Sequence, residues 1–187
     1  MKAVIEIGIK KTIKFGLITF LIVVYKLMIF PQMRVIFLRL LGAKIGKNVI
    51  IHDVKFFNYY RKGFKGLTIG DNSFIGNETM IDLADEIKIE DYVTLAERVL
   101  VLSHTNVGYK DHPLQKFFPP ISKAVGIGRG SFIGVNGVIM PGVHIASGTF
   151  VAAGSIVTED TKPYSLYAGT PARFIRFIKD REDEGRV

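Results

Sequence analysis

The chain contains four histidines and no cysteine, so the histidines are the side chains best suited to moving a proton near neutral pH. An imidazole titrates close to neutrality and can act as a general base. The absence of cysteine excludes a disulfide framework, a thiolate metal site and a cysteine nucleophile. The histidines also lack the spacing that a three-histidine zinc site would need, so we expect no metal. The four are His52, His104, His112 and His144.

Two aromatic-rich segments, residues 52–66 and 103–124, interrupt an otherwise regular sequence. Long insertions of this kind are commonly functional or disordered, and the aromatic content argues against disorder. His104 opens the second segment and is our preferred base, with His112 as its substitute. A histidine that enters a loop can also simply bond the backbone. We expect such structural roles for the other two histidines.

The regular part of the sequence has an aliphatic residue at every sixth position. A helix would show spacings of three and four, and an up-and-down barrel would show longer alternating strands. A period of six instead predicts coils of three short strands, in which the aliphatic side chains stack inside. The longest phased run is Ile127, Ile133, Ile139, Ile145, Val151 and Val157, and shorter runs begin at Ile45, Ile69 and Ile89.

We therefore predict an all-β parallel β-helix of roughly six or seven coils within residues 41–187. Small residues would ease the backbone through the corners of each coil. The loop 103–124 would leave the coils, and a short C-terminal helix would begin at about Ala172. Residues 1–40 would form a separate apolar helical region. Corner residues of this kind are Gly46, Gly70, Gly134 and Ala146.

The net charge of +8 is concentrated in the first quarter of the chain. Basic residues interleaved with stacking aromatics are not evident, so no nucleic acid is expected as a partner. Residues 15–30 are apolar except for Thr19 and Lys26, a run too short and too charged for a comfortable bilayer span. We favour a helix that lies in the inner leaflet of the cytoplasmic membrane, where its flanking lysines and arginines would meet anionic head groups. The alternative is a helix packed on its own domain or on a neighbouring subunit.

The ordered motifs between Leu41 and Ile178 resemble those of the hexapeptide-repeat acyltransferases, which include galactoside, maltose and serine acetyltransferases. The similarity is strongest to members that O-acetylate bacterial polysaccharides. It rests on the run from Ile127 to Val143, on Ala152–Thr158, and on the segment Ala168-Gly169-Thr170-Pro171-Ala172-Arg173-Phe174-Ile175-Arg176. The resemblance implies left-handed coiling, which the repeat period alone does not predict, and a homotrimer with sites between protomers.

The same resemblance implies an O-acetyltransferase that moves an acetyl group from acetyl-CoA to a sugar hydroxyl, in surface polysaccharide biosynthesis. Two alternatives stay open. One is an enzyme of this fold that acts on a sugar-nucleotide amine or on serine. The other is a non-catalytic β-helix scaffold.

The resemblance also assigns roles to individual residues. His104 matches the catalytic histidine, although many relatives carry a second histidine two positions later and this chain has Asn106 there. Asn77 is expected to hold the acceptor, and Asp82 either to bond sugar hydroxyls or to steady His104. Glu159 stands where relatives often have lysine, which would remove one phosphate contact. The expected acetyl-CoA contacts are corner positions Val135 and Ala153, then Thr158, and finally Arg173 and Arg176 as guanidinium forks for the phosphates.

Overall fold

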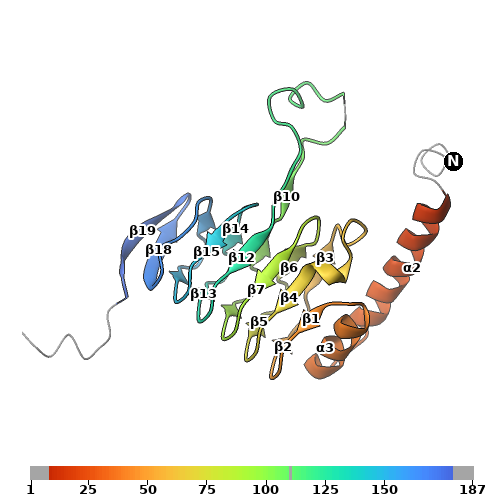
Figure 1. Cartoon of the computed structure of the whole chain (residues 1–187), viewed down its shortest axis with the longest axis horizontal. Coiled ribbons are helices and arrows are strands. Elements are labelled where there is room, and N and C mark those ends of the chain that lie inside the picture. Colours follow the sequence, from red (N-terminus) through yellow and green to blue (C-terminus); the bar gives the residue numbers. More distant parts are fainter. Residues whose placement is uncertain (1–8, 110, 179–187) are drawn as a thin grey trace, which may run out of the picture.

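The computed structural model describes residues 9–109 and 111–178 as two helices followed by a stack of short strands (Figure 1). Helix α2 spans Ile9–Lys26 and α3 spans Pro31–Leu40. The outer ends of the predicted regions 1–40 and 41–187 lie outside the described residues. Within these residues the fold is mostly β, with two parallel sheets, a third sheet that is parallel except for its last strand, and one antiparallel ribbon.

Sheets A and C contain five strands each. Sheet A consists of β1 (Lys44–Ile45), β4 (Leu67–Ile69), β7 (Ile87–Ile89), β12 (Val125–Ile127) and β15 (His144–Ile145). Sheet C consists of β3 (Lys55–Phe57), β6 (Met80–Asp82), β9 (Leu100–Val101), β14 (Val138–Ile139) and β17 (Ile156–Val157).

Sheet B contains seven strands. In chain order they are β2 (Ile50–Ile51), β5 (Phe74–Ile75), β8 (Thr94–Leu95), β13 (Phe132–Ile133), β16 (Phe150–Val151), β18 (Ser165–Gly169) and β19 (Ala172–Phe177). The short helix η1 (Phe64–Gly66) precedes β4, and β10 (His104–Thr105) pairs with β11 (Ile121–Ser122) as an antiparallel ribbon at the base of the protruding loop in Figure 1.

Successive strands fall in turn into sheets A, B and C, so the chain winds as three-sided coils. Five complete coils are followed by β18 in sheet B, one or two fewer than the repeat count predicts. The sixth turn is not completed, because the chain folds back after β18 into the antiparallel strand β19. The predicted excursion 103–124 leaves the coils after β9, as expected.

The period of six has the physical basis that the sequence suggested. The inward residue of each short strand lies directly over its counterpart one coil away, as in the pairs Ile69 with Ile89 and Ile133 with Val151. The phased aliphatic residues from Ile127 to Val157 are at most 1% exposed. Burying such side chains is worth about 1.5–3 kcal/mol each, so the columns hold the coils together.

The corners need glycine where the next coil passes closest. A Cβ on Gly70 would lie 2.4 Å from Asp91 Oδ1 and 2.5 Å from the Asp91 nitrogen. One on Gly134 would lie 2.5 Å from the Ala153 nitrogen. All three distances are shorter than any van der Waals contact, so a side chain there would push the coils apart.

The apolar N-terminal segment forms two helices rather than one. α2 ends at Lys26, and Pro31 begins α3 instead of only ending the preceding helix, since proline fits the first turn, where no amide hydrogen bond is lost. Tyr25, Val35 and Leu38 join the core of the first coils, so one face packs on its own domain. Among the described residues, neither helix combines the length and the low charge needed to cross a bilayer.

The predicted C-terminal helix from Ala172 is wrong, because these residues form strand β19. β19 pairs with β18, which itself pairs with β16, so the hairpin covers the open edge of sheet B. Phe174, Ile175 and Phe177 are residue types that favour a strand next to such an edge.

Two neighbouring isoleucines test the inward column directly. Ile51 is fully buried and Ile50, the preceding residue of the same strand, is 40% exposed. Ile51→Ala should lower the free energy of unfolding by about 2–5 kcal/mol, because it leaves a cavity. Ile50→Ala should lower it by less than about 1 kcal/mol. Equal losses in denaturant titrations would contradict the assignment of the inner and outer faces.

Candidate active site

The coils bring together three polar side chains that are far apart in sequence. Asn58 follows β3, Asp82 ends β6, and His104 follows β9, so all three lie where strands of sheet C reach the corner toward sheet A. The His104 Nδ1 is in hydrogen-bond contact with Asp82 Oδ2. The Asn58 amide donates to Asp82 Oδ1 at 2.8 Å and lies 3.3 Å from His104 Nδ1.

The Asp82 carboxylate accepts hydrogen bonds at both of its oxygens. Its Oδ2 accepts the backbone N–H groups of Ser103 at 3.1 Å and His104 at 3.0 Å. Its Oδ1 accepts the N–H of Ala84 at 3.1 Å in addition to the Asn58 amide. Burial alone would raise the pKa of Asp82, but the hydrogen bonds from His104, Asn58 and the backbone outweigh it and hold that pKa below its ordinary value. Asp82 is therefore an ionised carboxylate at neutral pH.

This geometry fixes how the imidazole can act. The Asp82 side chain is fully buried and that of His104 is 26% exposed. A carboxylate against Nδ1 favours the tautomer with its proton on Nδ1, which leaves Nε2 with a free lone pair. Two roles were expected for Asp82. The buried carboxylate can support His104, but it exposes no surface to which an acceptor could bind.

Asn58 is a member of this group that the sequence did not single out. It lies in the aromatic segment 52–66 and has a positive φ of 56°, as several corner residues do. An asparagine in such a turn is ordinary, since Asn tolerates this conformation. Only the stacking of β3 on β6 shows that its amide faces Asp82.

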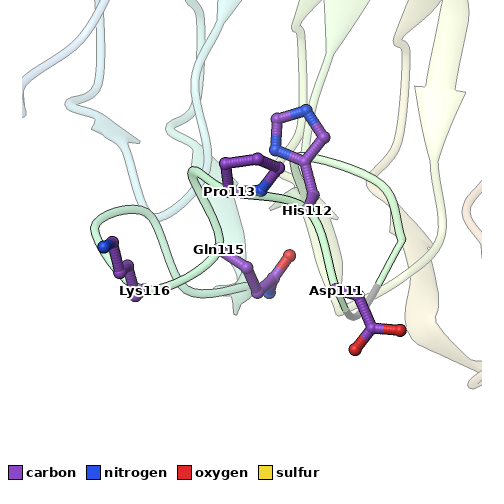
Figure 2. A pocket seen from close by; sticks show the side chains of 5 residues that line it. All are labelled: Asp111, His112, Pro113, Gln115 and Lys116. Carbon is purple, nitrogen blue, oxygen red and sulfur yellow. The ribbon is translucent and has the colours of Figure 1, made fainter.

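His112 lies far out on the loop between β10 and β11 and serves the loop itself. Its Nδ1 accepts the Leu114 N–H at 3.2 Å. It lines a hollow of about 490 Å³ together with Asp111, Pro113, Gln115 and Lys116, and Figure 2 shows its ring and the Asp111 carboxylate pointing in opposite directions. Within the part of the chain that the structure describes, His112 thus has no carboxylate partner such as Asp82 provides for His104.

The other two histidines have structural contacts. The His52 ring packs edge-on against Phe74, with centroids 5.1 Å apart, and the His144 N–H donates to Asp160. Within residues 9–109 and 111–178, no three acidic or histidine side chains converge as a metal site would require.

A second set of expected residues lines the corner between sheets B and C. Backbone hydrogen bonds of 2.8 Å connect Arg98 N to the Asn77 carbonyl and Gly154 N to the Val135 carbonyl, so these residues belong to one column of corners. Ala153 lies next to Gly134 in the same column. Asn77 and Val135 line one hollow of about 340 Å³ with Glu78, Glu97 and Arg98, three charged residues that the sequence did not single out.

The expected site residues therefore divide between two edges of the prism. Asn77, Val135 and Ala153 lie on the edge between sheets B and C. His104 and Asp82 lie on the edge between sheets C and A, and Thr158 follows the last strand of sheet C at that same edge. Sheet C separates the two groups within one chain.

Arg173 and Arg176 point to one face of β19 despite their spacing of three. Arg173 pairs with Ala168 and Arg176 with Leu166, while a register shift leaves Ile175 unpaired between them. Because directly paired residues share a face, this bulge turns both guanidiniums to the same side. Glu159 lies 3.7 Å from Arg173, and both side chains are largely exposed, so the ion pair is weak. Arg173 is thus available to another anion.

A family model and two curated proteins are similar to this chain in sequence. A family model described as the hexapeptide repeat of succinyl-transferase matches residues 124–159. The galactoside O-acetyltransferase of Escherichia coli K12 is 33% identical over 145 residues, which cover 75% of this chain and 66% of that protein. The putative colanic acid biosynthesis acetyltransferase WcaF of the same organism is 33% identical over 76% of this chain and 74% of its own length.

Solved structures are similar over most of the chain. A galactoside acetyltransferase in complex with coenzyme A has a TM-score of 0.75 and 28% identity, over 88% of this chain and 80% of that one. A hexapeptide-repeat acetyltransferase of Vibrio cholerae in complex with acetyl coenzyme A has a TM-score of 0.74 and 27% identity, over 86% of this chain and 84% of that one. With one third of its residues identical to WcaF over about three quarters of both chains, this protein belongs to the hexapeptide-repeat acetyltransferase family.

Proposed function

We propose that this protein is an acetyl-CoA-dependent O-acetyltransferase that acts on a sugar hydroxyl during surface polysaccharide biosynthesis, and that its coils are left-handed like those implied by the family resemblance. The observation that carries the proposal is the buried carboxylate of Asp82 against Nδ1 of a partly exposed His104. A non-catalytic scaffold would have no use for an ionised, fully buried Asp82, because burying a charge is costly.

In the proposed reaction, the Nε2 atom of His104 accepts the proton of the sugar hydroxyl. The hydroxyl oxygen then forms a bond to the thioester carbonyl carbon, and the carbon–sulfur bond breaks. The departing sulfur takes the proton back from the imidazolium, so no proton is gained or lost. Asp82 stabilises the transient positive charge on the ring and keeps the reactive nitrogen oriented, as in a Ser-His-Asp triad.

The donor would lie along the corners that carry Val135 and Ala153. Small side chains there leave backbone groups accessible to the amides of the pantetheine arm. Arg173 and Arg176 share a face of β19 and can bind the coenzyme A phosphates through charge-assisted hydrogen bonds. Thr158 would contact the donor from the neighbouring corner.

A homotrimer would unite the two edges. His104 of one protomer lies across sheet C from its own Asn77 and Val135, so a complete site needs the other edge from a neighbour. The outward residues Met80, Leu100, Val138 and Ile156 of sheet C are apolar, although only partly buried. Such a face suits contact with another subunit better than contact with water.

The N-terminal helices would place the enzyme on the inner surface of the cytoplasmic membrane. One face of α2 packs on the core, but Leu17, Phe20, Val23 and Leu27 are more than half exposed. Residues 7–52 contain no acidic residue, so the surrounding charge is uniformly basic. Exposed apolar side chains flanked by cations suit an anionic bilayer surface. We propose residues 1–40 as this membrane-associated region ahead of a β-helix domain at 41–187.

The histidine assignment can be tested by two alanine variants. His104→Ala should lower kcat for acetyl transfer to a sugar hydroxyl by about 10²–10⁴-fold, since the proton acceptor is lost. His112→Ala should leave kcat within about threefold, because its ring serves the loop backbone. The opposite ranking would make His112 the base.

Assays with hydroxyl and amine acceptors in parallel separate the O-acetyltransferase from the N-acetyltransferase alternative.

Asp82 is proposed as a positioning residue, and its test must separate support of His104 from a purely structural role. Asp82→Asn should lower kcat by about a hundredfold and leave the KM for acetyl-CoA unchanged. The loss should fall on kcat for every hydroxyl acceptor tested, because the imidazole is misoriented whichever acceptor is bound. A change in KM with kcat unchanged would refute the role.

The same variant has a consequence for stability. The pKa of Asp82 is lowered in the folded state, so its carboxylate contributes stability above the unfolded pKa of about 3.9, and this contribution is lost as the pH falls through the lower folded pKa. The stability of Asp82→Asn should therefore depend less on pH below about pH 4 than that of the wild type. Identical acid profiles in urea titrations would contradict the hydrogen-bond assignment.

Membrane binding can be tested by co-sedimentation with vesicles. The full chain should bind vesicles rich in phosphatidylglycerol more tightly than neutral ones, and the variant Phe20→Glu/Leu27→Glu should lose binding at least about tenfold. Phe117→Glu is a matched control, since Phe20 and Phe117 are 63% and 66% exposed but Phe117 lies on the distant loop. Equal binding by all three proteins would refute the assignment to α2.

A further inference from the structure

A hollow of about 330 Å³ lies between α2 and the aromatic segment that follows it. Its walls are Ile22 and Lys26 of α2 and residues 54–60. The hollow belongs neither to the corner column expected to hold the donor nor to the loop around His112. None of its lining residues has been assigned a role so far except Asn58.

The lining combines two chemistries. Most of its residues are apolar or aromatic, which suits a hydrocarbon chain. The exceptions, apart from Asn58, are the ammonium groups of Lys26 and Lys55, and neither is paired with a carboxylate among the described residues. The lining contains no acidic residue. An apolar wall beside two unpaired ammonium groups is complementary to an amphiphile with an anionic head, of which a phosphate is the strongest hydrogen-bond acceptor.

The hollow adjoins the proposed catalytic group. Asn58 lines it, and the Asn58 amide lies 2.8 Å from Asp82 Oδ1 and 3.3 Å from His104 Nδ1. A ligand held there by its lipid and phosphate parts would extend its remaining part past Asn58 toward the imidazole. Binding energy from these remote parts would then orient the reacting hydroxyl.

The hollow also adjoins the face proposed to meet the membrane. Ile22 and Lys26 line the hollow, while the next residue after each is apolar and exposed: Val23 lies in α2, and Leu27 follows its last residue. Consecutive helical residues are about 100° apart, so the two faces are neighbours. A hydrocarbon chain could therefore pass from a bilayer at this face into the hollow without crossing water.

We propose that this hollow binds the lipid-phosphate part of the acceptor, so that the substrate is a glycan carried on a long-chain lipid phosphate rather than a free sugar. The inference rests on the proposed function, since it names the acceptor class of that reaction. A water-soluble sugar nucleotide would use the lysines but not the aromatic wall. A free sugar would use neither.

The binding site can be tested without catalysis, by calorimetric titration of the full chain with farnesyl phosphate below its micellar concentration. Lys55→Gln and Tyr60→Ala should each weaken binding by about tenfold, since they remove the cation and part of the wall. Matched controls are Lys65→Gln, an exposed lysine of the same segment outside the lining, and Tyr92→Ala, whose side chain is as exposed as that of Tyr60 (53% and 52%). Both controls should bind like the wild type.

Farnesol and inorganic phosphate, titrated separately, should each bind at least about tenfold more weakly than farnesyl phosphate, because each lacks one of the two contacts. Absence of farnesyl phosphate binding would overturn the proposal, and so would an equal loss in the control variants, which would indicate non-specific binding. Binding that none of the four variants weakens would indicate adsorption to the exposed helix and would also overturn it.

An activity measurement separates this proposal from the one on which it rests. The same glycan is supplied as a polyprenyl phosphate conjugate and as a methyl glycoside, and Lys55→Gln should raise KM only for the conjugate. Acetyl transfer to both acceptors with equal KM, together with no farnesyl phosphate binding, would reject the lipid-phosphate site and keep the O-acetyltransferase. Farnesyl phosphate binding without transfer to either acceptor would reject the proposed reaction and keep the site.

Discussion

The structure depends on the hydrogen bonding of each coil to the next in one fixed register. Backbone bonds of 2.8–3.0 Å run from coil to coil, for example from Gly46 to Ile69 and from Ala96 to Ile133. The columns of buried aliphatic side chains enforce this register, because a slip of one residue would turn every inward side chain toward water. As a result, residues about 20 positions apart become neighbours. The corner that holds Asn58, Asp82 and His104 is a direct product of this stacking.

That corner also shows why the arrangement can hold a buried charge. A carboxylate removed from water costs several kcal/mol unless its oxygens are fully bonded. Asp82 accepts from three backbone N–H groups, the Asn58 amide and the His104 ring, so its charge is well compensated. Four of these five donors belong to Asn58, Ser103 and His104, which lie on neighbouring coils. The rigid stack therefore both creates the charged group and keeps the histidine in one orientation.

The sequence predicted the interior of this fold well and its surface contacts poorly. The period of six identified the buried columns, and the glycine positions identified the tight corners, because both follow from repetition. The last strand was predicted as a helix, because its pairing with β18 is not visible in the sequence. Only that pairing reveals the bulge that turns Arg173 and Arg176 to one face. His104 stood out by its place at a strand-to-loop junction. Its contacts with Asp82 and Asn58 depend on which coils are adjacent, which no local pattern encodes.

The proposed mechanism depends on the state of one imidazole ring, and nitrogen-15 NMR of the histidine side chains measures that state directly. At a pH where the ring is neutral, we expect His104 to carry its proton on Nδ1, held by Asp82, and Nε2 to be unprotonated. Asp82→Asn, compared at the same pH, should weaken this preference. A wild-type His104 that carries its proton on Nε2, or that exchanges freely between the two tautomers as an exposed histidine does, would contradict the proposed base.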